Sequence, residues 1–363
     1  SKLYDPTFDK EEFCKLVGID MDFFEERLEK CAAYSKYKPS LLISQLSKKD
    51  ILAVQESLYK FRAIDIVTRT VRKYPYHNAA IMLGYVSEVS ADFLSKNPDY
   101  SMGDYHGTQG LERIYEEHLR GKKGKRYVVV DAHNVELGQY NNGENDIAAE
   151  QGSNLILEID SELQSYGEYL MQGKRGSIVA IDPQTGGILA MVSAPCYDPN
   201  LLVGRDRSKN YKMLQGDTAN RPLLNRAVAG EYPPGSTFKV FNALVTLQEN
   251  AINQHTRFSC QGKDSQPMQC THAHESPLNV VAAIRESCNP YFRLAFEKYI
   301  SQYDRPAEGL EIWHGYAEQF GFGQAFKTDV YGQRKGMVPN SAYYDRIYGK
   351  NRWRATTIRS LAI

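Results

Sequence analysis

The sequence predicts an α+β fold, in which helices flank a mostly antiparallel sheet. Several segments carry apolar residues at helical spacing, most clearly residues 111–120. Short apolar segments bounded by turn residues indicate strands. Residues 176–181 and 187–193 flank a loop with an early proline and a late glycine, which predicts a hairpin. At 363 residues, of which 42% are hydrophobic, the chain can form two domains with a core each. We expect these domains to span residues 1–151 and 152–363.

The first predicted domain begins with helices. Polar residues that can cap a helix precede three segments with helical periodicity. Gly18 and Gly121 lie where two of the predicted helices should end. The predicted caps are Asp9, Asp20 and the pair Ser47 and Asp50, and the predicted helices span residues 10–16, 21–33, 48–61 and 111–120. The predicted strands span residues 63–72, 74–76, 126–131 and 134–140. An apolar segment covers residues 78–86, and a polar linker covers residues 141–151.

The second predicted domain holds the hairpin and further helices. Asp160 can cap a helix that follows a strand at 154–159. Another helix begins near Ser236, and a later one spans 276–286. Pro290 opens the next helix, because proline is favoured at the first helical position.

Charge and hydropathy exclude two classes of interaction for this chain. Lys plus Arg and Asp plus Glu both number 44, so the chain lacks the net positive field that favours nucleic acid. It has no run of about twenty apolar residues, which a membrane-spanning helix requires. It starts at Ser1 without methionine and stops at Ile363 inside an apolar run. We therefore expect it to be part of a longer protein.

A serine and a lysine three residues apart form the most informative motif. Ser236 and Lys239 share one face of a predicted helix, so the lysine amine can take the proton that a serine hydroxyl must lose to become a nucleophile. Burial would lower the pKa of the lysine, as this role requires. The helix N-terminus offers N–H groups to an oxyanion, and Pro233-Pro234-Gly235 forces a tight entry into the helix.

The spacing Ser-x-x-Lys is common, and context separates its three occurrences here. The other two pairs are Ser35 with Lys38 and Ser57 with Lys60. Both lie in charged, tyrosine-rich sequence without a partner motif, so we interpret them as solvated surface. The third pair is followed by a loop that carries Ser287 and Asn289 between two helices. A capped, buried helix with an incidental lysine is the structural alternative, but burying a lysine without a role is costly.

The six cysteines are irregularly spaced, so they do not imply a disulfide framework in a chain of this length. Two of them lie in a polar loop close to two histidines, and thiolate and imidazole are the usual ligands of zinc. The zinc candidates are Cys260, Cys270, His272 and His274. A disulfide or free thiols are the alternatives. We interpret Cys288 as a small buried residue rather than a nucleophile.

With these motifs, the second domain resembles the transpeptidase domain of class B penicillin-binding proteins, a family of serine acyltransferases. The segments that carry the resemblance are 176–193, 197–200, 225–227, 234–239 and 287–289. The first domain is similar to the pedestal, or dimerisation-type domain, of the elongation type, penicillin-binding protein 2. Its matching segments are 72–75, 83–86, 110–112 and 119–124.

The resemblance implies a peptidoglycan D,D-transpeptidase of cell-wall elongation, and it implies no cofactor. Ser236 would attack the D-Ala-D-Ala end of a stem peptide, with its own backbone N–H as one oxyanion donor. Lys239 would act as the general base, and Ser287 would relay a proton near the leaving group. Asn289 would hold the substrate amide and the Lys239 side chain. An amine from a neighbouring stem peptide would then resolve the acyl-enzyme.

The resemblance also implies partners and a location. β-Lactam antibiotics would acylate Ser236 and stay bound. A glycan polymerase of the elongation machinery would be the protein partner. Proteins of this type are anchored in the bacterial inner membrane by one N-terminal helix, which is absent from this chain, and their catalytic domain faces the periplasm.

One motif of the family lacks a counterpart. In the family, a Lys-Ser/Thr-Gly strand binds the substrate carboxylate and supplies the second oxyanion donor. Lys327-Thr328-Asp329 lacks the glycine and comes too soon after Asn289 to be this motif. We therefore expect either that the 363-residue chain alone is inactive or that the motif lies in a C-terminal part beyond Ile363.

Two other functions compete with the transpeptidase. A class D β-lactamase or β-lactam sensor also uses the sequence Ser-Thr-Phe-Lys, but usually carries Ser-x-Val and lacks a pedestal. Rapid release of the acyl group would identify a hydrolase. A catalytically silent scaffold is disfavoured because Ser236, Lys239, Ser287 and Asn289 are all intact.

Overall fold

The computed structural model describes residues 8–34, 40–43, 46, 48–61, 64, 66–67, 71–131, 136–204 and 206–363. The chain divides into two compact units. The first unit comprises residues 1–230 and 328–333, and the second comprises 231–327 and 334–363. The boundary expected after residue 151 stays a prediction. Helices dominate, and the described strands form three two-stranded antiparallel sheets, so the predicted α+β class is confirmed.

Three N-terminal helices form a small apolar core of their own. They are α1 (Lys10–Val17), α2 (Met21–Tyr34) and α3 (Lys48–Ser57), which continues into the 3-10 turn η2 (Leu58–Lys60). The predicted cap of α1 is confirmed, since the Asp9 carboxylate accepts the Glu12 N–H at 2.9 Å. Gly18 ends α1 in the left-handed conformation, with φ of 64°. Ser47, of the predicted capping box, lies outside the described residues.

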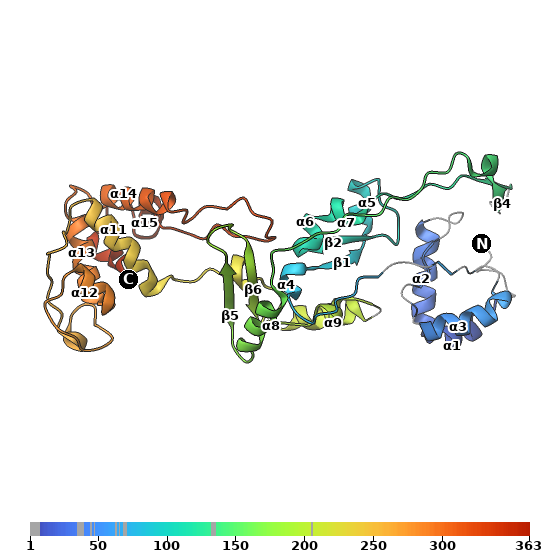
Figure 1. The fold of residues 1–363 in the computed structure, drawn as a ribbon, viewed down its shortest axis with the longest axis horizontal. Helices are drawn as coiled ribbons and strands as arrows, with labels where there is room; N and C mark the ends of the chain where they lie inside the picture. The colour runs from blue at the N-terminus through green and yellow to red at the C-terminus, as the bar shows by residue number, and fades with distance from the viewer. Residues whose placement is uncertain are drawn as a thin grey trace. The chain divides into compact units, whose positions relative to one another are not determined.

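The central part of the first unit is a hairpin flanked by short helices (Figure 1). The strands β1 (Tyr85–Glu88) and β2 (Tyr105–Gln109) pair antiparallel. The helices are α4 (Ala80–Leu83), α5 (Ala91–Lys96), α6 (Gly110–Ile114) and α7 (Glu116–Arg120). The single helix predicted at 111–120 is therefore wrong: the chain breaks at Tyr115, whose φ of −100° and ψ of 17° are not helical.

The strands predicted at 63–72 and 74–76 are not found among the described residues of these segments. Residues 75–77 form a bend instead. The Asn200 side chain explains the difference, because it accepts the Tyr74 N–H at 3.2 Å and donates to the Tyr74 carbonyl at 2.9 Å. A side-chain amide thus satisfies the backbone groups that a neighbouring strand would have bonded.

A second ribbon of the first unit contains β3 (Val128–Val130) and β4 (Glu136–Gln139), which pair antiparallel and are shorter than predicted. The segment predicted as a linker begins in the 3-10 turn η3 (Tyr140–Gly143) and then runs back along residues 122–125. The Lys122 N–H donates to the Glu150 carbonyl at 2.9 Å, and the Ile147 N–H donates to Lys125 at 2.8 Å. These bonds make the segment part of the ribbon rather than a free linker.

The predicted hairpin is confirmed as β5 (Gly176–Ile181) paired with β6 (Ile188–Ala194). The helix α8 (Ser161–Leu170) packs on β6, and Asp160 caps it as predicted. Buried Gln164 ties the two together, because its amide bonds both the N–H and the carbonyl of Met191. The strand predicted at 154–159 is wrong: the segment has no ladder, and Ile156 is 94% exposed. The rest of this region holds η4 (Pro199–Leu202), α9 (Arg207–Gly216) and α10 (Arg226–Ala229).

One segment of the first unit comes from far along the sequence. Residues 328–333 pack there although their neighbours in the chain belong to the second unit. The Tyr115 hydroxyl donates to the Asp329 carboxylate at 2.7 Å, and the Arg113 guanidinium lies over the Tyr331 ring. Val330 packs against the buried cluster around Met82 and Met191. Asp329, the last residue of Lys327-Thr328-Asp329, therefore contributes a structural contact within the first unit.

The second unit is helical. Its elements are η5 (Gly235–Phe238), α11 (Lys239–Gln248), η6 (Gly262–Asp264), α12 (Val280–Arg285), α13 (Asn289–Ile300), α14 (Pro306–Gln319), α15 (Ser341–Tyr348), α16 (Ala355–Ile358) and η7 (Arg359–Ala362). Its core gathers aromatic side chains around Trp313, whose indole N–H donates to Asn242 at 2.8 Å. The helix predicted at 276–286 starts only at Val280, because Asn279 caps it after the Ser276-Pro277 peptide.

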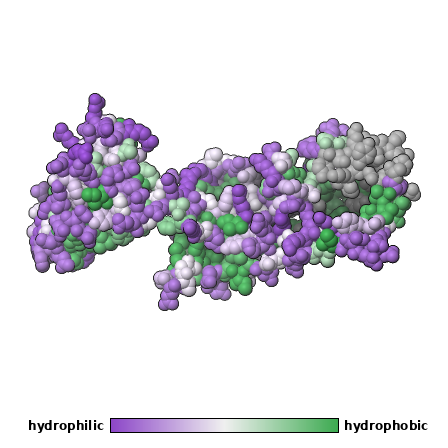
Figure 2. All heavy atoms as spheres, turned by 90° about the horizontal axis from the view of Figure 1, so that it is seen from above, coloured by the Kyte–Doolittle hydropathy of each residue, from purple (hydrophilic) through white to green (hydrophobic). Residues whose placement is uncertain are grey.

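The surface is mainly polar on the face drawn in Figure 2, with apolar areas between hydrophilic ones. In the basic segment 122–126, Lys122, Lys123 and Arg126 each pair with a carboxylate. All three side chains are more than half exposed, so this segment is solvated surface. Within the described part of the chain, every helix is too short or too polar to span a membrane.

Candidate active site

Ser236 lies in the 3-10 turn η5, one turn before the start of α11. Gly235 takes a positive φ of 62° between Pro234 and Ser236, which glycine adopts without strain. The Thr237 hydroxyl donates to the Pro234 carbonyl at 2.7 Å and holds the turn closed. Ser236 is exposed, whereas Lys239, the first residue of α11, is only 2% exposed. The turn thus leaves the Ser236 side chain exposed to solvent, while the Lys239 side chain is buried.

The Ser-x-Asn motif surrounds the Lys239 amine. Its Nζ lies 2.7 Å from the Ser287 carbonyl oxygen, 3.1 Å from Ser287 Oγ and 2.5 Å from Asn289 Oδ1. An ammonium group has three N–H donors, and these three acceptors match them. A neutral amine has two donors and a lone pair, so the Ser287 hydroxyl can donate to it instead. Both protonation states therefore keep all three contacts.

The loop between α12 and α13 places these groups. Ser287 has a positive φ of 48°, a left-handed conformation that is uncommon for residues other than glycine. The Cys288 N–H donates to the Ala283 carbonyl at 3.0 Å, and Cys288 is fully buried as predicted. The Asn289 side chain also donates to the Gln269 carbonyl at 3.1 Å. Asn289 is thus held at both ends of its amide, one of which is on Lys239.

The electrostatic environment of Lys239 suits a general base. Burial lowers the pKa of Lys239 below its ordinary value, while the nearby thiols of Cys270 and Cys288 oppose this shift. A lowered pKa leaves more of the amine neutral near pH 7, and only the neutral amine can accept a proton. The buried amine next to a hydroxyl that can donate or accept is therefore suited to move a proton between two groups.

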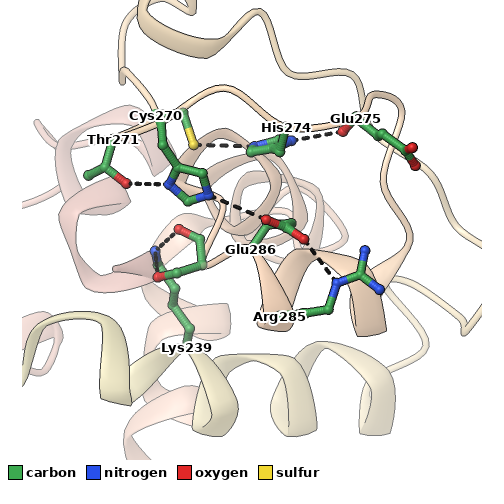
Figure 3. Close-up of polar contacts among 9 residues, drawn as sticks. Lys239, Cys270, Thr271, His274, Glu275, Arg285 and Glu286 are labelled. Carbon is green, nitrogen blue, oxygen red and sulfur yellow. Dashed lines mark hydrogen bonds and ion pairs between the residues drawn. The ribbon is translucent and has the colours of Figure 1, made fainter.

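A cluster of sulfur and imidazole groups lies behind the Ser-x-Asn loop. The metal-ligating atoms of Cys260, Cys270, His274 and Cys288 all lie within 4.8 Å of one another. Cys270 Sγ is 3.3 Å from His274 Nε2 (Figure 3). Burial raises the pKa of the Cys270 thiol, but hydrogen bonds from the Asn289 backbone and from His274 lower it to about 7. Burial raises the pKa of Cys288 to about 12.

The cluster corrects the predicted zinc candidates in one position. His272 is not part of it, because its ring contacts the Thr271 hydroxyl at 3.1 Å and the Glu286 carboxylate at 3.4 Å. Cys288 takes its place. Three thiolates and one imidazole form a donor set that suits tetrahedral zinc. The sequence offered no signal for Cys288 as a ligand, since α12 separates it from the other three in the chain and it acquires this position only through folding.

Two family models match the chain. The model for the penicillin-binding protein dimerisation domain matches residues 5–157, and the model for the penicillin-binding protein transpeptidase domain matches residues 176–362. The chain belongs to the penicillin-binding protein family. Both resemblances stated from the sequence, to the transpeptidase domain and to the pedestal of penicillin-binding protein 2, are confirmed.

Individual relatives agree with this assignment. The chain is 31% identical over 328 residues to the peptidoglycan D,D-transpeptidase MrdA of Escherichia coli, covering 87% of this chain and 50% of that protein. Among solved structures it is similar to Pseudomonas aeruginosa PBP2 in complex with WCK 5153, with a TM-score of 0.60 and 29% identity over 82% of this chain and 61% of that one. A peptidoglycan synthase complex that coordinates polymerization and crosslinking contains a chain with a TM-score of 0.65 and 28% identity, over 95% and 61% of the two chains. The chain thus spans about half the length of the curated relatives it matches.

Proposed function

We propose that the protein containing this chain is a peptidoglycan D,D-transpeptidase that cross-links stem peptides through an acyl-enzyme on Ser236. The observation that carries the proposal is the buried Lys239 amine, held by Ser287 and Asn289 one helical turn from an exposed serine. The family match and the MrdA relative support the same reaction.

The proposed reaction has two steps. In acylation, Ser236 Oγ attacks the carbonyl carbon of the D-Ala-D-Ala bond while Lys239 takes the hydroxyl proton. The Ser236 N–H stabilises the oxyanion that forms. Lys239 passes its proton through the Ser287 hydroxyl to the departing amine, and D-alanine leaves. In the second step, an amine of a neighbouring stem peptide attacks the ester carbonyl carbon, and the bond from this carbon to Ser236 Oγ breaks. The same groups transfer the amine proton to Ser236 Oγ, and the free serine is restored.

Asn289 has two tasks in this scheme. Its Oδ1 fixes the Lys239 amine, and the Nδ2 hydrogen that does not bond the Gln269 carbonyl would bond the peptide group of a bound substrate. β-Lactams carry an amide and a strained acyl group, so they would acylate Ser236 in the same way. We further propose that the protein is anchored in the inner membrane with this chain in the periplasm, and that it works with a glycan polymerase of the elongation machinery. The similarity to a chain of a peptidoglycan synthase complex supports that partnership.

A labelling experiment tests the catalytic serine. The full-length protein is incubated with a fluorescent penicillin, and the intact mass is recorded over time. We expect a stable adduct that is lost in Ser236→Ala and in Lys239→Ala. Ser57→Ala is the matched control, because Ser57 belongs to another Ser-x-x-Lys pair, and it should label normally. Absence of any adduct would favour a silent scaffold, and an adduct that disappears within seconds would favour a β-lactamase-like hydrolase.

We also propose that Cys260, Cys270, His274 and Cys288 hold a zinc ion that ties the loop before α12 to the start of α13. Such an ion would brace the Ser-x-Asn loop without taking part in the reaction. Elemental analysis of the purified full-length protein should find about one zinc per chain. His274→Ala should lose it, whereas His272→Ala, the matched control outside the cluster, should retain it. Equal zinc content in both variants would contradict the proposed ligand set.

A further inference from the structure

A cavity in the first unit takes no part in the proposed reaction. Its volume is about 350 Å³, and all the residues that line it belong to the first unit. Its walls are formed by α4, α6, residues 155–159, the β5–β6 hairpin and residues 328–331. Small-molecule sites in proteins typically have about 300–1,000 Å³, and this volume equals that of about a dozen water molecules in the liquid. The cavity is therefore large enough for a small organic molecule.

Much of the cavity wall is apolar. Met82 and Met191 line the cavity and are 8% and 2% exposed. Leu157 and Ile159 also line it and pack against the buried cluster that contains the two methionines. Methionine side chains are flexible and adapt to the shape of an apolar partner. This part of the wall suits an apolar chain rather than a polar group.

One amide group interrupts the apolar wall. Asn225 lines the cavity and is 8% exposed, and its Oδ1 accepts the Ala227 N–H at 3.1 Å as the N-cap of α10. In the described part of the chain, the hydrogen-bond partner of its Nδ2 is the Met191 sulfur at 3.8 Å, which is a weak acceptor. A buried amide N–H without a strong acceptor costs free energy. A carbonyl oxygen that entered the cavity would supply that acceptor.

The charge of the wall limits what can enter. Among the described residues that line the cavity, Glu158 and Asp329 carry carboxylates, and none carries a basic side chain. Glu158 is exposed, while the Asp329 carboxylate accepts a hydrogen bond from the Tyr115 hydroxyl at 2.7 Å. Like charges repel, so these two groups disfavour an anion. The apolar wall disfavours a buried cation, so an uncharged molecule fits best.

We propose that this cavity binds a small uncharged amphipathic molecule. Its apolar chain lies against Met82 and Met191, and its carbonyl oxygen accepts a hydrogen bond from Asn225 Nδ2. The cavity is also lined by residues 328–331, so the bound molecule stabilises the docking of this segment onto the first unit. The proposal rests on the first unit alone and holds whether or not Ser236 is acylated.

A titration followed by NMR tests the site. The full-length protein is labelled at its methionine methyl groups, and Met82→Leu and Met191→Leu assign the two resonances. We expect hexanamide to shift both resonances and to saturate them at millimolar concentration, as suits so small a ligand. The exposed Met213 on α9 is the internal reference and should not shift. Unchanged Met82 and Met191 resonances, or equal shifts of all methionines, would overturn the proposal.

Hexanoate tests the class of ligand. It has the same chain as hexanamide but a negatively charged head group. Because Glu158 and Asp329 line the cavity, we expect its dissociation constant to be at least about tenfold higher than that of hexanamide. Equal affinity for the two molecules would contradict an uncharged ligand.

Asn225→Asp tests the hydrogen bond. The variant keeps an acceptor for the Ala227 N–H but loses the amide N–H, so the dissociation constant for hexanamide should rise by about tenfold. Asn340→Asp is the matched control, because Asn340 caps α15 in the same way and lies outside the cavity wall, and it should bind hexanamide like the unmodified protein. A folded Asn225→Asp variant that binds as tightly as this control would overturn the assigned hydrogen bond. If Asn225→Asp fails to fold, the methyl shifts of the unmodified sequence still decide the site.

Discussion

Replacing Asn289 with alanine removes the side chain that holds Lys239 at the reacting centre. Asn289 Oδ1 lies 2.5 Å from Lys239 Nζ, and Asn289 Nδ2 lies 3.1 Å from the Gln269 carbonyl. The alanine variant keeps the Ser287 contacts with the amine but leaves one N–H without an acceptor in a buried site. The amine can then turn away from the direction in which it must receive the serine proton.

The size of the effect follows from these contacts. A hydrogen bond to a charged group contributes about 1.5–3 kcal/mol, and each 1.4 kcal/mol corresponds to about tenfold in rate. We therefore expect acylation by a fluorescent penicillin to slow by about 10- to 150-fold in Asn289→Ala. The assay is stopped-flow measurement of the second-order acylation rate on the full-length protein, with circular dichroism to confirm that the variant is folded.

Asn289→Asp is the matched variant for the same position. It keeps an acceptor toward Lys239 and adds a negative charge, which favours the ammonium form and raises the pKa of Lys239. Its acylation rate should therefore be low at neutral pH and recover at higher pH, whereas Asn289→Ala should stay slow throughout. A folded alanine variant that acylates at the rate of the unmodified protein would refute the idea that Asn289 positions the base.

Three further predictions concern the base and the first unit. Because burial lowers the pKa of Lys239, the acylation rate should rise with pH, with a midpoint below the ordinary value of 10.5, as a pH–rate profile would show. Glu112→Ala should lower the free energy of unfolding by about 1–3 kcal/mol in urea titrations, because it breaks a bridge at 2.8 Å to the half-exposed Arg72. Gly84→Ala should lower the free energy of unfolding by about 2 kcal/mol or more, since a Cβ there would lie 1.8 Å from the Gln109 carbonyl and φ is +79°.

Each of these predictions has a control. Lys60→Ala, outside the active site, should leave the pH–rate profile unchanged. Glu117→Ala on α7 removes an exposed carboxylate and should change stability by no more than about 0.5 kcal/mol. Gly216→Ala adds a Cβ with nothing within 4 Å. It should also change the free energy of unfolding by no more than about 0.5 kcal/mol. A Glu112 or Gly84 variant as stable as its control would contradict the packing seen around that residue.

Local sequence signals predicted much of the fold. Asp9, Gly18 and Asp160 act within one helical turn of the ends they form, so their effect does not depend on distant residues. The elements predicted wrongly depend on long-range contacts. Residues 74–76 lack strand partners because Asn200, far along the chain, bonds the Tyr74 backbone. Residues 154–159 have strand-like composition but no partner strand along their length.

In the candidate site, too, local sequence predicts some features, whereas others depend on long-range contacts. Ser236 and Lys239 are predictable because helical spacing places them on one face, and Ser287 and Asn289 are predictable as a motif. The contacts among these four residues, and the burial that lowers the pKa of Lys239, come from the packing of α11 against α13. The sulfur cluster was only partly predictable: three of its four members lie in one loop, whereas Cys288 joins them through the fold.

The docking of residues 328–333 onto the first unit affects how the protein can be made and divided. The chain is synthesised from its N-terminus, so the first unit lacks this packed segment, with Asp329 and Val330, until residues 231–327 of the second unit have been made. The two units therefore cannot mature strictly one after the other. A cut after residue 230 would separate the first unit from the segment that completes its packing, so residues 1–230 alone should be less stable than the same residues in the intact protein.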